Sequence, residues 1–138
     1  METKRRPFVL IAEDDVDSRL IYTEVLKKTA IQVNYKFIGS GPELLDNLKD
    51  PSKQMPCLVI TDLKSPIDAH ILESIMEDQL IRAVPIVVLT SEQEEAEARR
   101  AYASCVNSYI MKPGPFSDFV EIMNRIFCYW FRTVKLPW

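Results

Sequence analysis

Acidic residues follow two short apolar segments of the chain, at the point where each segment ends. Glu13 and Asp14 come directly after residues 8–12, and Asp62 comes directly after residues 58–61. Short, continuous apolar segments of this kind predict buried parallel strands. In an open α/β sheet the carboxyl ends of the strands share one edge, which is where ligands bind. We therefore expect these three carboxylates to lie together although they are far apart in the sequence.

Two more apolar segments end in residues that suit the same site. Thr90 follows residues 86–89, and Lys112 follows residues 109–111. Three acids, a hydroxyl and an amine at one edge indicate a divalent cation beside an anionic group such as phosphoryl. Mg²⁺ suits such a site, because it binds few protein carboxylates, keeps several waters and often bridges to phosphate. The alternative is a helix-capping cluster without chemistry, which the presence of Thr90 and Lys112 disfavours.

The segments that must position these residues alternate between strand and helix patterns. Strands are expected at residues 8–12, 33–38, 58–61, 86–89 and 109–111. Helices are expected at residues 17–28, from residue 42 to the break at 50–52, around residues 71–76, after a capping box at 91–94, and at 116–130. Five strands alternating with five helices imply a parallel sheet covered on both faces. The expected fold class is therefore α/β, with a doubly wound five-stranded parallel sheet.

The first and third helices carry more specific expectations. Asp17 is the expected N-cap of the first helix. The expected apolar stripe of that helix consists of Leu20, Ile21, Val25 and Leu26. His70, the only histidine, is expected to face solvent at the start of the third helix.

Composition narrows the class of protein. The 138 residues suit one domain, and 47 % apolar with 27 % charged residues is the composition of a globular protein. A net charge of −3 offers no basic surface for nucleic acid or for anionic lipid. The apolar segment after Lys4–Arg6 is too short for a signal peptide or a membrane span. We therefore expect a soluble, cytoplasmic protein. The three glycines form no dinucleotide-binding fingerprint.

The order of an acidic pair, an Asp, a Thr and a Lys-Pro, each at a strand end, resembles the receiver domain of two-component response regulators. The resemblance covers roughly residues 7–130. It implies a flavodoxin-like strand order of 2-1-3-4-5 with helices on both faces. It also implies a single receiver domain over residues 1–138, with a core at about 7–130 and an aromatic C-terminal extension at 131–138. Such a domain is a phosphoacceptor and signalling protein, not a small-molecule enzyme.

The resemblance assigns a metal role to four residues. Asp62 matches the aspartate that accepts the phosphoryl group. Asp14 matches the acid that binds Mg²⁺ directly, and Glu13 matches the acid that holds the metal through water. The main-chain carbonyl of Lys64 matches the third protein ligand.

Three further residues match the parts that respond to phosphorylation. Thr90 matches the switch hydroxyl that bonds a phosphoryl oxygen, and Lys112 matches the lysine that pairs with the phosphate. Tyr109 matches the aromatic residue that turns inward on activation. The implied donor is a phosphohistidine on a histidine kinase or phosphotransfer protein, and the implied output is contact with a downstream protein.

The C-terminal part resembles a narrower group, the stand-alone receivers associated with bacterial phytochrome kinases. The resemblance rests on residues 107–113, on Phe116 to Val120 and on the pair Tyr129-Trp130. Residues 126–131 are apolar around the whole helix, which is more than one core face can bury. We therefore expect a homodimer through the last helix and tail. The alternative is that these rings continue the core stripe of the helix.

The loop after Asp62 departs from the family pattern. Residues 65–70 lack the usual glycine, and the loop is two residues short. This favours, as an alternative, a degenerate receiver that binds partners without phosphorylation. An aspartyl-phosphate phosphohydrolase is a third possibility, but it requires a second acid at the position of Lys64.

Overall fold

A single parallel sheet forms the centre of the computed structural model, which describes residues 6–62, 69–91, 99 and 106–136. Its strands are β1 (Phe8–Ala12), β2 (Asn34–Ile38), β3 (Leu58–Thr61), β4 (Ile86–Thr90) and β5 (Ser108–Met111). They lie in the order β2-β1-β3-β4-β5, and every pair of neighbours is parallel. The predicted fold class and the predicted strand order are both confirmed.

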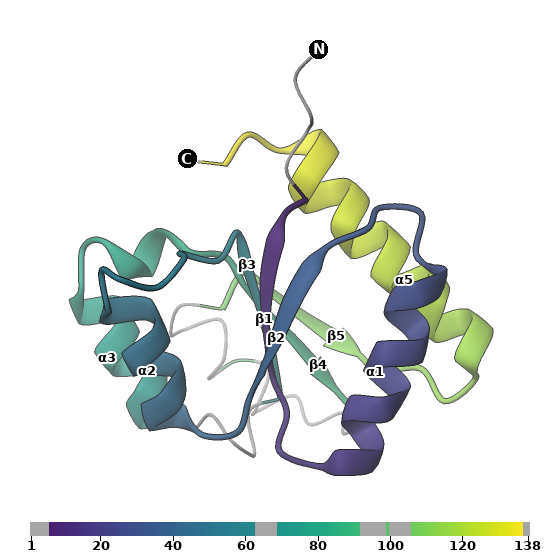
Figure 1. Cartoon of the computed structure of the whole chain (residues 1–138), viewed down its shortest axis with the longest axis horizontal. Coiled ribbons are helices and arrows are strands. Elements are labelled where there is room, and N and C mark those ends of the chain that lie inside the picture. Colours follow the sequence, from purple (N-terminus) through teal and green to yellow (C-terminus); the bar gives the residue numbers. More distant parts are fainter. Residues whose placement is uncertain (1–5, 63–68, 92–98, 100–105, 137–138) are drawn as a thin grey trace.

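Helices cover both faces of this sheet. They are α1 (Val16–Lys28), α2 (Gly41–Lys49), α3 (Ala69–Glu77), the short 3-10 helix Ile81–Ala83 and α5 (Phe116–Cys128). In Figure 1, α1 and α5 lie on one face of the sheet, and α2 and α3 lie on the other. The fourth helix expected after the capping box falls on residues 92–105, nearly all of which lie outside the described residues. Within the described part of the chain, no helix is long and apolar enough to cross a membrane.

The sheet separates two hydrophobic clusters. Alternate residues of β1 illustrate this, because Val9 and Ile11 face the cluster under α1 and α5, whereas Leu10 and Ala12 face the other. All residues of β3 and β4 are buried, as a strand covered on both faces requires. This double burial explains why β3 and β4 are almost continuously apolar segments of the sequence.

The structure corrects two expectations about α1. Its N-cap is Asp15, whose Oδ2 accepts a hydrogen bond of 2.9 Å from the Ser18 backbone N–H. Asp17, the expected cap, lies inside the first turn. The apolar stripe is also rotated: Leu20 and Ile21 are 60 % and 47 % exposed, whereas the buried residues are Tyr22, Val25 and Leu26.

The last helix also departs from its predicted end. The α-helical hydrogen bonding of α5 stops at Cys128, and residues Tyr129–Thr133 form a wider π-helical turn. Trp130 and Phe131 pack at the margin of the cluster under α1 and α5, while Tyr129 is exposed. His70 faces solvent at the start of α3, as predicted.

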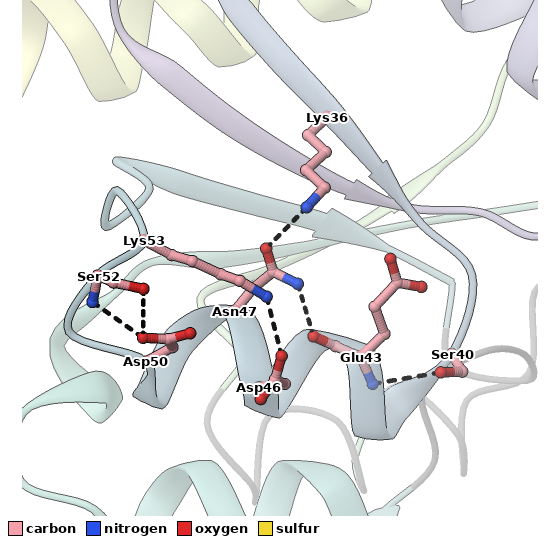
Figure 2. A network of polar contacts seen from close by, with 8 residues as sticks. All are labelled: Lys36, Ser40, Glu43, Asp46, Asn47, Asp50, Ser52 and Lys53. Carbon is pink, nitrogen blue, oxygen red and sulfur yellow. Dashed lines mark hydrogen bonds and ion pairs between the residues drawn. The ribbon is translucent and has the colours of Figure 1, made fainter.

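Polar contacts fix α2 against the sheet (Figure 2). Ser40 caps the helix by accepting a hydrogen bond from the Glu43 backbone N–H. Asn47 is buried between helix and strand, where its Oδ1 accepts a 3.1 Å hydrogen bond from Lys36 of β2. The Asn47 Nδ2 donates at 2.8 Å to the Glu43 carbonyl, so the buried amide is satisfied on both sides.

Candidate functional site

The sheet register brings the predicted acids to one edge. Ala12 of β1 is paired with Thr61 of β3, so Glu13 and Asp62 follow directly after partnered residues. Neighbouring strands lie only about 4.8 Å apart, which makes the two acids neighbours. In Figure 1 the carboxyl ends of the strands lie along the lower edge, where α1 begins.

Thr90 and Lys112 reach the same edge through the next two strands. Thr90 ends β4 and is buried; it is paired with Met111 of β5. The backbone N–H of Lys112 then donates a 2.7 Å hydrogen bond to the Thr90 carbonyl. This bond extends the β4–β5 pairing by one residue and places both side chains beside the acids.

Tyr109 lies further back in β5 and is paired with Val88. It is half-buried and packs against the cluster on the α2 and α3 side of the sheet. Lys64, the remaining predicted metal ligand, lies outside the described residues. The structure therefore brings five of the seven predicted residues to one edge, with Tyr109 behind them.

Glu13 and Asp14 have different surroundings despite being adjacent. The Glu13 N–H donates to the Ile38 carbonyl at 2.9 Å, and its Oε1 accepts from the Asp15 N–H at 3.1 Å. Its carbonyl accepts a 2.5 Å hydrogen bond from Arg19 Nε. These bonds fix the half-buried Glu13, whereas Asp14 is exposed.

Negative charge accumulates at this edge. Burial raises the pKa of the Glu13 carboxyl, and the charges of Asp14 and Asp15 add to the increase. The Asp15 N–H and the Lys112 ammonium act in the opposite direction but are outweighed. Burial also raises the pKa of Tyr22, and the charges of Glu13 and Asp62 raise it further. A cation at this edge would relieve the excess of negative charge.

The donor set fits a hard divalent cation. Carboxylate oxygens are the ligands that Mg²⁺ prefers, and the exposure of Asp14 leaves room for the waters that this ion keeps. Among the described residues, no three His, Cys, Asp or Glu side chains already converge to hold a metal. Without a bound cation the carboxylates repel one another, so their oxygens are not held close together before the metal binds.

Tyr22 belongs to this site, although the sequence reasoning did not select it. Its ring lies 4.9 Å from the Lys112 ammonium, measured from the ring centroid. A signal was present, because Tyr22, Val25, Leu26 and Thr29 have the i, i+3, i+4, i+7 spacing of a buried helix face. The predicted apolar stripe included Leu20 and Ile21 in place of Tyr22, so this buried face was missed.

Comparisons with known proteins agree with this arrangement. The family model of the response regulator receiver domain matches residues 9–124. The probable methanogenesis regulatory protein FilR2 of Methanothrix harundinacea is 31 % identical over 95 % of this chain and 88 % of its own length. Response regulator Rcp1 of Synechocystis is 29 % identical over 94 % of this chain and 92 % of its own length.

Solved structures show the same fold. The response regulator RPA3017, in red light signalling of R. palustris, superposes with a TM-score of 0.88 at 26 % identity. The alignment covers 96 % of this chain and 99 % of that one. The Mn²⁺-bound form of Rcp1 superposes with a TM-score of 0.81 at 25 % identity, with the same coverage.

Proposed function

The chain belongs to the response regulator receiver domain family, and we propose that it is a stand-alone receiver that accepts a phosphoryl group on Asp62 in the presence of Mg²⁺. The observation that carries this proposal is the meeting of Glu13, Asp62, Thr90 and Lys112 at one sheet edge. The similarity to FilR2 and Rcp1 supports the receiver role, because this chain spans 88 % and 92 % of their lengths.

Asp62 is the proposed nucleophile. One of its carboxylate oxygens forms a bond to phosphorus while the phosphorus–nitrogen bond of a phosphohistidine breaks, and the electron pair of that bond returns to the imidazole. A carboxylate is a weak nucleophile, so alignment and charge neutralisation must supply most of the catalysis. Bound Mg²⁺ supplies positive charge beside the transferred group. Lys112 supplies a second positive charge on the other side of Asp62.

The other residues hold the metal or respond to the new phosphoryl group. Asp14 is the proposed direct ligand of Mg²⁺, Glu13 acts through water, and the Lys64 carbonyl completes the protein ligands. The Mn²⁺-bound form of the relative Rcp1 supports a divalent cation. Thr90 donates its hydroxyl to a phosphoryl oxygen, and Tyr109 moves inward as a consequence.

The proposed partners are proteins. A histidine kinase or phosphotransfer protein in the cytoplasm supplies the phosphoryl group, and a downstream protein recognises the phosphorylated form. The net charge of −3 supports neither nucleic acid nor an anionic membrane surface as a target.

We also propose a homodimer through the end of α5 and the edge strand β5. Ser108, Ile110, Arg125, Ile126, Tyr129 and Trp130 line a shallow groove between these two elements. Tyr129 is 49 % exposed and stacks edge-on against Trp130, which presents two large rings beside the groove. Aromatic residues favour interface cores, and a twofold contact would use the same patch on both copies.

A degenerate receiver is the second candidate. It is favoured by the loop after Asp62, where residues 65–70 lack the glycine that the family usually has. Such a protein would keep the fold and bind its partners without phosphorylation. The phosphorylation experiment that tests the main proposal also distinguishes a phosphoaccepting receiver from a degenerate one.

The test is incubation with acetyl phosphate and Mg²⁺ followed by intact-protein mass spectrometry. Wild type is expected to gain one phosphoryl group, and Asp62→Asn is expected to gain none, because an amide is not a nucleophile here. Asp118→Asn, which changes an exposed acid at the start of α5, is the matched control and should be labelled like wild type. Equal labelling of Asp62→Asn would refute the assignment, and an unlabelled wild type would favour the degenerate receiver.

A further inference from the structure

The Lys112 side chain rests on two aromatic rings at the margin of the site. Its Nζ atom lies 4.9 Å from the centroid of the Tyr22 ring and 5.6 Å from that of the Phe119 ring. Both distances fall within the roughly 6 Å over which an ammonium is attracted to the negative face of a ring. Lys112 is half-buried, so water screens this attraction only in part.

The rings are fixed by packing from three elements. Tyr22 comes from α1 and is 3 % exposed, and Phe119 comes from α5 and is 2 % exposed. The two rings meet edge to face, with centroids 5.4 Å apart and an interplanar angle of 81°. Phe37 of β2 lies against the Tyr22 ring, with centroids 6.4 Å apart. The Lys112 side chain is flexible and can adjust to the rings, whereas close packing holds the rings in place.

Electrostatic interactions connect the Lys112 ammonium, the acids of the site and Tyr22. The Lys112 charge lowers the pKa of Glu13, although burial outweighs it. The charges of Glu13 and Asp62 in turn act on the Tyr22 hydroxyl, whose pKa is raised. Tyr22 thus lies near both the lysine that its ring contacts and the acids Glu13 and Asp62.

We propose that Tyr22 and Phe119 form a cradle that positions the Lys112 ammonium for phosphoryl transfer to Asp62. Tyr22 is then a positioning residue, and its ring, not its hydroxyl, carries the effect. This inference rests on the proposed function, and the bond changes are those given above. A lysine side chain has many rotamers, and ring contacts reduce the number that the ammonium samples. An ammonium already placed needs less reorganisation when charge develops on the transferred group.

The kinetic test compares rates of phosphorylation by acetyl phosphate and Mg²⁺. Tyr22→Leu removes the ring and is expected to lower the rate about five- to tenfold, the value of a partly desolvated cation–π contact. Tyr22→Phe keeps the ring and is expected to restore the rate. Tyr35→Leu is the matched control, because Tyr35 joins the same ring cluster through Phe37, whereas the Lys112 ammonium rests on Tyr22 and Phe119.

A double-mutant cycle separates positioning from structural damage. In the background of Lys112→Met, adding Tyr22→Leu is expected to change the rate less than about twofold, since the coupled partner is already absent. NMR gives a second measure, because the rings shift the ε-methylene protons of Lys112 upfield. That shift should persist in Tyr22→Phe and decrease in Tyr22→Leu, where only the Phe119 ring remains beside Lys112.

The outcomes distinguish this inference from the proposed function. A folded Tyr22→Leu that reacts at the wild-type rate overturns the cradle, as does an equal loss in the Lys112→Met background. If Tyr22→Leu does not fold, Phe119→Leu takes its place under the same criteria. A wild type that gains no phosphoryl group overturns the proposed function, and the positioning role falls with it.

Discussion

At the scale of single residues, the adjacent acids Glu13 and Asp14 have different surroundings, and the proposed metal roles follow from that difference. Glu13 is half-buried and its carboxylate accepts a hydrogen bond from the Asp15 N–H, so part of its capacity is already used. Asp14 is exposed beside it and can approach a hydrated cation. The difference supports Asp14 as the direct ligand and Glu13 as the acid that acts through water.

Asp14→Ala is therefore expected to weaken Mg²⁺ binding and to slow phosphorylation together. The loss of affinity should be about tenfold or more, since even residues that only support a ligand are worth that much. Calorimetric titration with Mg²⁺ measures the affinity. Asp17→Ala, an exposed acid one turn away, should leave it unchanged. An Asp14→Ala protein that binds Mg²⁺ like wild type would remove this residue from the site.

The Tyr22 hydroxyl should make the free energy of unfolding depend on pH in the alkaline range. Its pKa is raised by burial and by the charges of Glu13 and Asp62, so the folded protein keeps a proton that the unfolded chain releases near pH 10. The free energy of unfolding should therefore be unaffected by this group below that pH and should fall as the pH rises above it.

Tyr22→Phe lacks the ionisable hydroxyl and should lose less stability between pH 9 and 11 than wild type does. Urea denaturation at several pH values measures the difference, and the lysines cancel because both proteins contain them. Parallel stability curves for the two proteins would show that the hydroxyl is not shielded in the folded state.

At the scale of elements, the start of α1 decides how the acidic loop is held. The N-cap of the helix lies two residues earlier than the sequence pattern predicts, at Asp15 instead of Asp17. The Asp15 Oδ2 also accepts a 3.0 Å hydrogen bond from the Ser18 hydroxyl. This places the helix N-terminus directly after Glu13 and Asp14 and shortens the loop that carries them.

Asp15→Ala is expected to cost about 1 kcal/mol in the free energy of unfolding, which is typical of a lost N-cap. Asp17→Ala removes only a favourable charge from the first turn and should cost about 0.3–0.5 kcal/mol. Urea denaturation of both variants makes the comparison. The assignment of the cap would be wrong if the order of the two losses were reversed.

At the scale of the whole molecule, the end of α5 forms both core and surface. Phe131 packs against Phe127, with ring centroids 5.5 Å apart, so it closes the core at this edge. Tyr129 points to the other side and remains exposed. The π-helical turn separates these roles, and Tyr129 is the exposed ring among the described aromatic residues at this end of the helix.

Tyr129→Glu is accordingly expected to convert a wild-type dimer into a folded monomer, since a charge would be buried in an apolar contact. Light scattering at micromolar concentration measures the mass. Leu80→Glu is the matched control, because Leu80 is an equally apolar exposed residue outside this groove. A monomeric wild type would refute the dimer and leave the rings as cover for the core.

The sequence by itself determined the sheet and the residues at its edge. The central strands β1, β3 and β4 are apolar segments that end in, or are followed by, a polar residue, because strands covered on both faces are buried along nearly their whole length. The strand order and the edge shared by Glu13, Asp62, Thr90 and Lys112 follow from that pattern and from the family resemblance. The strands and the edge depend on local composition, which is written in the sequence, whereas the strand order was implied by the family resemblance.

Only the tertiary structure decided which face of α1 is buried, which acid caps it and where Lys112 rests. Leu20 and Ile21 are as apolar as core residues, but the rotation of α1 is set by what Tyr22 meets, namely Phe37 of β2 and Phe119 of α5. The Lys112 contact needs the same three elements in place. Contacts between residues almost a hundred positions apart depend on packing, and packing selects among faces that periodicity alone leaves equivalent.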